Sequence, residues 1–387
     1  MVGRNRFCRE DELLLLLARG TLTPEVQGKA LACLQEELSW SLILKQALLH
    51  GVFPLLYRNL LALGFPGVPT EVRATLDRLY KTNAARNLLL ARELARVLQA
   101  FSAAGIPVVP LKGIALAQSL YGDQALRICS DIDILVPRRM APKAFNLLLT
   151  AGYAAEFTGG LFADRSLLRQ DIETALARRE GEFFYHVELH WGILWRPWLD
   201  AAAIEDLWAE VRPQTFAGVP AYALSPEWEL LFLAVHAPGH SWQLKWIVDI
   251  HEVCSRGRVD WERLWTKAKR LGWEEVLRFS LGASVALFST PIPDAYVPAE
   301  LPSWVTLFPA RPSASNARAD AFFLLHFLGQ RSDKLRYLLR VLLVPTRADR
   351  LFLRLPSTLR FLYYPLRPLR LGCKWGWRLV RAVSQPF

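Results

Sequence analysis

Two aspartates separated by one isoleucine lie inside an apolar stretch, RICSDIDILV, at residues 127–136. Side chains alternate across a strand, so Asp131 and Asp133 would share one face while the neighbouring isoleucines occupy the other. Two carboxylates this close repel each other and lose hydration unless a cation lies between them. A divalent ion that prefers oxygen ligands, such as Mg²⁺, would meet this need. The pattern therefore predicts a metal site on one face of a buried strand.

A second apolar stretch, YHVELHW, carries Glu188 and His190 on one face. If this strand lies beside the first, Glu188 supplies a third carboxylate to the same site. Three acids on adjacent strands can hold two Mg²⁺ ions, as phosphoryl and nucleotidyl transfer require. Alternatively, Glu188 would pair with Arg127 or cap a helix. His190 would either assist proton transfer or hydrogen-bond a neighbouring acid.

A lysine and a glycine, Lys112 and Gly113, end the strand before the aspartates and begin a helix. Backbone N–H groups and the dipole at a helix N-terminus favour phosphate, and Lys112 would add a positive charge. The turn is not a P-loop, because the glycine-rich lead-in and the Ser or Thr after Gly-Lys are both missing. Arg127 would contact a triphosphate or, equally well, stabilise the aspartates.

Polar residues further along the chain also have two interpretations each. Lys245 would face a nucleotide, or it would form an i,i+4 pair with Asp249 on a helix. His236 and His240 stand four residues apart, the spacing at which two imidazoles on one helix face bind zinc. Pro and Gly lie between them and no third ligand has a clear position. Structural or substrate-side roles are therefore favoured over a metal site.

The elements that must position these residues come in a helical, then mixed, then helical order. Apolar residues recur every three or four positions near both ends of the body, which predicts helices. Short β-branched and aromatic stretches alternate with helices between them, and a polar insertion at 164–180 permits helix. The predicted regions are an N-terminal helical region (1–104), an α/β core (105–200), a C-terminal helical region (201–290), a Pro-rich linker with a short helix (291–330) and a basic aromatic tail (331–387).

Three ordered motifs resemble the uncharacterised nucleotidyltransferase family of the DNA polymerase β-like superfamily: LKGIALAQSLYGDQALRICSDIDILV, VELHWGI and HAPGHSWQLKWIVDI. The resemblance spans roughly residues 10–260. It implies an α+β fold with a small polymerase β-like mixed sheet, flanked by N- and C-terminal helical segments. It also implies that Asp131 and Asp133 bind catalytic Mg²⁺, with Glu188 as the third acid. The superfamily places Gly-Ser after its first strand, whereas Gly113 is followed here by Ile114.

The function implied by the resemblance is transfer of a nucleoside monophosphate from an NTP, such as ATP, to a hydroxyl of an acceptor. The acceptor would be a small molecule, a peptide or a protein, and two Mg²⁺ ions, or Mn²⁺, would be the cofactor. Two alternatives remain open. One is a catalytically inactive binding module that keeps the nucleotidyltransferase fold. The other is transfer of a phosphate or sugar-phosphate group to a peptide.

The charge of the chain is concentrated at its C-terminal end. The tail at 331–387 holds 13 Lys or Arg against two Asp, which accounts for the whole net charge of +11, and the preceding residues balance at 34 of each sign. Arginines interleaved with aromatic residues fit an anionic membrane surface, RNA or an acidic partner. The simpler interpretation is a helical layer packed on the body, with arginine stems covering apolar surface.

The sequence predicts neither a transmembrane segment nor a signal peptide. No apolar run approaches the roughly 20 residues that a spanning helix requires. The leucine-rich start follows an acidic break at residues 10–12 and no small-residue cleavage site comes after it. Five scattered cysteines without a C-x-x-C pair suit a reducing compartment. These features together predict a cytoplasmic location.

Overall fold

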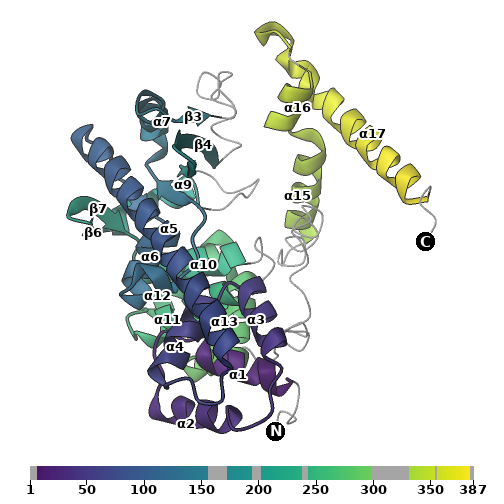
Figure 1. Ribbon diagram of the computed structural model, residues 1–387. Coiled ribbons are helices and arrows are strands. Elements are labelled where there is room, and N and C mark those ends of the chain that lie inside the picture. The colour runs from purple at the N-terminus through teal and green to yellow at the C-terminus, as the bar shows by residue number, and fades with distance from the viewer. Residues whose placement is uncertain are drawn as a thin grey trace.

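The computed structural model describes residues 7–155, 172–193, 202–237, 243–297, 331–353 and 355–383. Helices gather around a mixed five-stranded sheet in this part of the chain (Figure 1). The α+β class predicted from the sequence is confirmed. His240 and the greater part of the predicted linker at 291–330 lie outside the described residues.

The described part of the N-terminal region folds as five helices; apolar periodicity predicted a helical region without specifying their number. The run of leucines in the first helix is buried, and Thr23 accepts a hydrogen bond from the Val26 N–H at the start of the second. The helices are α1 (Arg9–Leu17), α2 (Pro24–Cys33), α3 (Trp40–Leu49), α4 (Phe53–Ala62) and α5 (Thr70–Ala103). The first four pack together at one end of the body, and α5 runs from them towards the sheet (Figure 1).

The long helix α5 fastens two distant parts of the core with polar side chains. Asn87 donates to the carbonyl of Gln124 at 2.6 Å and to that of Arg127 at 2.8 Å, just before the strand that carries Asp133. Two turns further on, Glu93 forms an ion pair with Arg178 at 2.7 Å. Because buried polar groups need partners, these bonds fix α5 against both segments.

The sheet has the strand order β1-β2-β5-β4-β3, and only β2 and β5 run parallel among these neighbours. Two helices, α6 and α7, connect its strands. The bounds are β1 (Val109–Pro110), α6 (Gly113–Tyr121), β2 (Ile132–Leu135), α7 (Ala141–Thr150), β3 (Ala154–Ala155), β4 (Glu173–Glu180) and β5 (Phe183–His190), with 3₁₀ turns at Gln124–Leu126 and Arg138–Met140. A parallel pair at the centre places both strand ends at the same edge of the sheet.

One strand of the core was not predicted. The polar insertion at 164–180 permitted helix in the sequence, whereas Glu173–Glu180 form strand β4, which pairs along its whole length with β5. Its sequence, ETALARRE, contains good helix formers, and pairing with an aromatic, β-branched neighbour overrides that propensity. Thr174 and Leu176 alternate as the buried positions of this strand.

The C-terminal region returns to helices after a hairpin that the sequence did not predict. Strands β6 (Arg212–Phe216) and β7 (Val219–Ala223) form this hairpin, and the Tyr222 N–H donates to the Val108 carbonyl at 2.9 Å, which attaches it beside β1. The helices are α9 (Ala202–Glu210), α10 (Pro226–His236), α11 (Leu244–Ser255), α12 (Trp261–Leu271) and α13 (Glu274–Phe288), and a 3₁₀ turn follows at Asp294–Tyr296.

Two hydrophobic cores lie on opposite faces of strand β2. Ile132 and Ile134 pack with the second half of α5 and with α7. Leu135 instead packs with α6 and with the helices of the two terminal regions. Asp133 alternates with the isoleucines and therefore shares the face of Leu135, towards the helical core.

The last described residues form three further helices, α15 (Arg331–Leu343), α16 (Arg347–Phe352) and α17 (Tyr363–Val383), with a 3₁₀ turn at Ser357–Leu362. They stand beside the body in Figure 1. We call residues 331–353 and 355–383 the C-terminal module. Among the helices that the structure describes, none combines the length and the apolar character needed to cross a membrane.

Candidate active site

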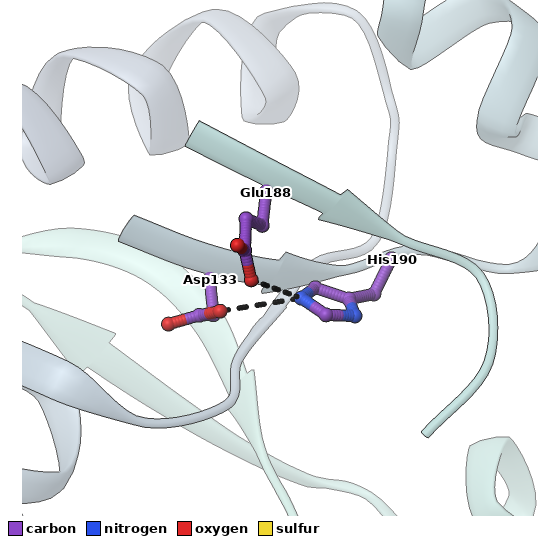
Figure 2. A group of neighbouring side chains, drawn as sticks. All are labelled: Asp133, Glu188 and His190. Atoms are coloured by element: carbon purple, nitrogen blue, oxygen red, sulfur yellow. Dashed lines mark hydrogen bonds and ion pairs between the residues drawn. The ribbon is translucent and has the colours of Figure 1, made fainter. Parts of the chain in front are cut away.

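Two carboxylates meet at the centre of the sheet because strands β2 and β5 are parallel and in register. Asp133 is paired with Glu188, and Leu135 with His190. Alternation along each strand then places Asp133, Glu188 and His190 on one face. Figure 2 shows both carboxylates directed towards one ring nitrogen of His190. One ligand atom from each of the three residues lies within 4.8 Å of the others.

His190 bridges three acids at the end of β5. Its Nε2 lies 3.2 Å from Oδ1 of Asp133 and 3.5 Å from Oε2 of Glu188, and its Nδ1 lies 3.0 Å from Oε2 of Glu173. Burial disfavours the charged ring, but hydrogen bonds to the three carboxylates outweigh it and raise the pKa of His190 well above its usual range. The three carboxylates therefore favour the charged form of His190, whose hydrogen bonds to neighbouring acids are one of the two roles considered for it.

Lys112 reaches the same carboxylates from the turn between β1 and α6. Its Nζ lies 3.0 Å from Oδ1 of Asp133 and 3.8 Å from Oε2 of Glu188. Burial of Lys112 would lower its pKa, but the charges of Asp133, Asp131 and Glu188 prevail and raise it. Its side chain is 7% exposed, so this ammonium is a fixed part of a buried site.

The two acids of the pair have opposite pKa shifts. Burial raises the pKa of Asp133 to about 6, although the hydrogen bond from His190 and the charge of Lys112 act against it. The hydrogen bond from His190 lowers the pKa of Glu188, against a smaller effect of burial. Asp133 is 2% exposed, and its Oδ2 is buried without a hydrogen-bond partner in the described part of the chain. A buried anionic oxygen without a partner is costly unless a ligand completes it.

Asp131 precedes β2 at a bend and is half-buried. Its carboxylate accepts a hydrogen bond from the Ser130 hydroxyl at 3.1 Å and lies outside the group of ligand atoms formed by Asp133, Glu188 and His190. Its charge still raises the pKa of Lys112. The four carboxylates of this region, those of Asp131, Asp133, Glu173 and Glu188, face two cations, Lys112 and His190. The formal charge of −2 suits a divalent metal ion.

Gly113 begins α6 with φ +64°, a backbone conformation that side chains disfavour. A Cβ atom there would lie 3.3 Å from the carbonyl oxygen of Asp131. The turn at the N-terminus of α6 therefore packs directly against the backbone of the aspartate loop. Ile114, which stands where the superfamily has serine, is buried in the core beneath the sheet.

Arg127 belongs to a different ion pair from those considered in the sequence. Its Nε lies 3.0 Å from Oδ2 of Asp249 on α11, and the Tyr121 hydroxyl donates to the other oxygen of Asp249 at 2.7 Å. The guanidinium also lies over the ring of Trp246, 5.0 Å from its centroid. Arg127 is 4% exposed, so it connects α11 to the segment before β2 from inside the protein.

Lys245 is half-buried on α11 and makes no ion pair with Asp249, which is taken by Arg127. Its ammonium lies 5.5 Å from the centroid of the Trp246 ring. Burial, followed by the positive charge of Arg127, lowers the pKa of Lys245 to about 8. The i,i+4 interpretation is therefore wrong, and the nucleotide-facing role of Lys245 stays a prediction.

The structure also brings together residues that sequence reasoning did not connect. His236 on α10 lies against the site, with its Nε2 3.3 Å from Nζ of Lys112, and its ring stacks on Phe232. Glu173 contacts His190 from β4, a strand that the sequence did not predict. Neither contact has a local sequence signal, because both depend on elements that meet only in the folded chain.

Comparison with protein-family models gives a match over residues 36–289 to the uncharacterised nucleotidyltransferase family. This chain belongs to that family. The match includes Lys112, both aspartates, Glu188 and Lys245, so the whole candidate site lies within it. Comparison with curated proteins gives no match for this chain.

Among solved structures, an antigenic nucleotidyltransferase-like protein from Paracoccidioides brasiliensis matches this chain at 18% identity. The match covers 54% of this chain and 95% of the other, with a TM-score of 0.33. The family assignment therefore rests on the family model.

Proposed function

We propose that this family member is a Mg²⁺-dependent nucleotidyltransferase that moves a nucleoside monophosphate from an NTP to a hydroxyl of an acceptor. The observation that carries the proposal is the in-register pair Asp133 and Glu188 on parallel strands, with a buried Asp133 oxygen that has no partner among the described residues. An oxygen-rich site with a formal charge of −2 suits Mg²⁺, with Mn²⁺ as a substitute.

The ligands in this proposal are Asp133 and Glu188, with Asp131 from the preceding bend. A pair of bound Mg²⁺ ions would neutralise phosphate charge and favour ionisation of the attacking hydroxyl. His190 acts through the carboxylates: its two N–H groups hold Asp133, Glu188 and Glu173 in fixed positions. It is therefore a positioning residue.

Phosphate binding is assigned to Lys112 and to the N-terminus of α6. Gly113 permits the tight turn that begins α6 beside the aspartate loop, and the N-terminus of a helix favours phosphate. Lys112 already lies beside Asp133, so a triphosphate bound there would meet the ammonium and the metal-binding acids together. Lys245 is proposed to face the nucleotide, whereas Arg127 positions α11 through Asp249.

The proposed reaction forms one bond and breaks one. The acceptor hydroxyl attacks the α-phosphorus, the bond between that phosphorus and the bridging oxygen breaks in line, and pyrophosphate leaves with the electron pair. The hydroxyl proton passes to solvent or to a carboxylate of the site. Fixed charges placed where negative charge accumulates would supply much of the acceleration.

The proposed location of the protein is the cytoplasm.

A binding module without catalysis is the second candidate, and two observations favour it. Lys112 already neutralises Asp133, and buried Ile114 replaces the serine hydroxyl that would touch a phosphate. In this case nucleotide would bind weakly or not at all, and no pyrophosphate would be released.

A thermal-shift series separates the two candidates. The purified chain is melted with each of four NTPs, with and without Mg²⁺, beside Asp131→Asn/Asp133→Asn and the surface control Asp294→Asn. A ligand that binds only the folded state raises the melting temperature in proportion to the logarithm of its concentration. We expect Mg²⁺-dependent stabilisation by a triphosphate in the wild type and the control, and none in the double variant. Equal melting in all samples would contradict the proposed enzyme.

A further inference from the structure

The C-terminal module contains a buried charged cluster. Asp349 is 3% exposed at its centre, and its two oxygens lie 2.6 Å from Nη1 of Arg367 and 2.6 Å from Nε of Arg370. The N–H and the hydroxyl of Thr346 also donate to this carboxylate. Helices α16 and α17 are therefore joined by buried charged hydrogen bonds, where a water-soluble helical bundle would place apolar side chains.

Many apolar side chains are exposed on the module. Ten of the sixteen large hydrophobic side chains that are exposed in the described part of the chain lie here, although the module is a small part of it. On α15 they recur at the spacing of one helix face, and Phe352 and Leu369 are 73% and 66% exposed. The ten are Leu335, Leu338, Leu339, Leu343, Phe352, Leu353, Leu359, Phe361, Tyr364 and Leu369. An exposed apolar surface of this extent marks an interaction site.

An apolar groove opens between α16 and α17. Its volume is about 580 Å³, and Leu353, Leu366 and Leu369 are among its lining residues. Basic residues accompany this surface, since residues 331–387 carry a net charge of +11. Apolar side chains in a segment rich in arginine complement a surface that is both apolar and negatively charged.

We propose that the C-terminal module binds the surface of a lipid bilayer that contains anionic headgroups, lying in the interface without crossing it. The exposed leucines and phenylalanines would enter the acyl region, the groove would receive part of an acyl chain, and the arginines would meet lipid phosphates. Asp349 and its two arginines would stay paired inside the module. The family's catalytic centre would then work beside a membrane.

Charge and chemistry favour lipid over the other occupants. The rest of the chain is electrically balanced, with 34 residues of each sign, and offers the module no net opposite charge. Two modules from two copies would repel each other. RNA bases would stack on exposed aromatic rings. Seven of the ten exposed side chains here are leucines, on which bases do not stack.

Vesicle sedimentation of the full chain tests the proposal. Vesicles of phosphatidylcholine alone, or with 30% phosphatidylglycerol, are pelleted with wild type and with Leu335→Ser/Phe352→Ser/Leu369→Ser. A matched variant, Leu61→Ser/Leu88→Ser/Phe184→Ser, removes exposed side chains of the same types from the body. Since all six are at least half exposed, the fold should survive in both, which circular dichroism and the melting temperature would verify.

We expect wild type and the matched variant to pellet with anionic vesicles, more weakly in 500 mM salt, and the module variant to bind at least about tenfold less. Any of four results would overturn the proposal: no pelleting with anionic vesicles, equal pelleting with neutral ones, pelleting without vesicles, or undiminished binding by the module variant. Tighter binding of a single-stranded polyuridylate to the same surface would assign it to nucleic acid instead.

Discussion

Two buried carboxylates in this protein have opposite environments. Glu93 is 4% exposed, and both its oxygens accept hydrogen bonds from Arg96 and Arg178, with a further one from the Tyr153 hydroxyl. Burial alone would raise the pKa of Glu93, but these donors lower it to about 2. Asp133 is just as buried, has one oxygen without a partner among the described residues, and has a pKa raised to about 6.

The difference separates a carboxylate whose hydrogen bonds are complete from one that has an oxygen without a partner among the described residues. A buried charge with all its hydrogen bonds made costs little, while an incomplete one costs stability that a bound cation can return. Both acids lie in the same core, so burial alone would not distinguish them. What distinguishes Asp133 is its Oδ2 atom, which has no hydrogen-bond partner among the described residues.

The largest effect should come from Asp133→Asn. This change removes a negative metal ligand while it keeps the shape of the side chain, so we expect the rate of nucleotidyl transfer to fall about 10³-fold. The melting temperature should stay the same or rise, because an incompletely paired buried charge disappears. Pyrophosphate release and thermal melting measure the two properties. Full activity in the variant would remove Asp133 from the site.

Glu93→Gln should show the reverse pattern. Loss of this charge leaves Arg178 without its buried partner, so we expect the free energy of unfolding to fall by roughly 3 kcal/mol. The transfer rate per folded molecule should stay unchanged. Urea denaturation gives the stability, with Glu180→Gln as the control, since Glu180 also pairs with Arg178 but is 64% exposed and should contribute less than about 1 kcal/mol.

The pH dependence of stability should distinguish the same two acids in metal-free buffer. The folded pKa of Asp133 is above its unfolded value of 3.8, so its contribution is fully present below pH 3.8 and is lost as pH rises through about 6. The difference in unfolding free energy between wild type and Asp133→Asn should therefore fall by up to roughly 3 kcal/mol between pH 4 and 7.

Glu93 should behave in the opposite way, because its folded pKa is below its unfolded value of 4.5. Its contribution is present above pH 4.5 and is lost as pH falls towards 2. The difference between wild type and Glu93→Gln should thus be constant from pH 5 to 7 and shrink below pH 4.5. Identical pH profiles for the two variants would show that the two carboxylates do not differ as described.

The smallest effect should come from Lys245→Gln. Because Lys245 makes no ion pair with the described residues, stability should change by less than about 1 kcal/mol. We expect KM for the NTP to rise about tenfold, with kcat nearly unchanged, if the lysine faces the nucleotide. Arg127→Gln provides the contrast: it leaves Asp249 unpaired and should destabilise the fold. An unchanged KM would give Lys245 a purely structural role.

Alternation along single strands was enough to predict much of the candidate site. The shared face of Glu188 and His190 and the position of Asp133 depend only on local geometry, and both strands exist as expected. The turn at Lys112 and Gly113 was also visible, because a lysine and a glycine at a strand-to-helix junction have few other uses. Apolar periodicity was enough to predict that the N-terminal region is helical.

Long-range contacts could not be predicted in the same way. Arg127 pairs with Asp249, and Lys112 lies beside His236. More than 120 residues separate the two partners in each case, and no local pattern specifies either contact. Strand β4 was missed because its residues favour helix until β5 pairs with them. The sequence also placed Asp131 beside Asp133 on one strand, whereas β2 begins one residue after Asp131.

Two polar side chains of α5, those of Asn87 and Glu93, set a fixed distance between two parts of the core. Asn87 holds the loop that leads to Asp133, and Glu93 holds β4 beside β5, about 9 Å further along the helix axis. Inserting one residue between them would rotate Glu93 by roughly 100° and withdraw it from Arg178. The spacing between these two positions therefore matches the separation between the loop before β2 and strand β4, and a change in the length of α5 would shift one relative to the other, although α5 contributes none of the residues of the candidate site.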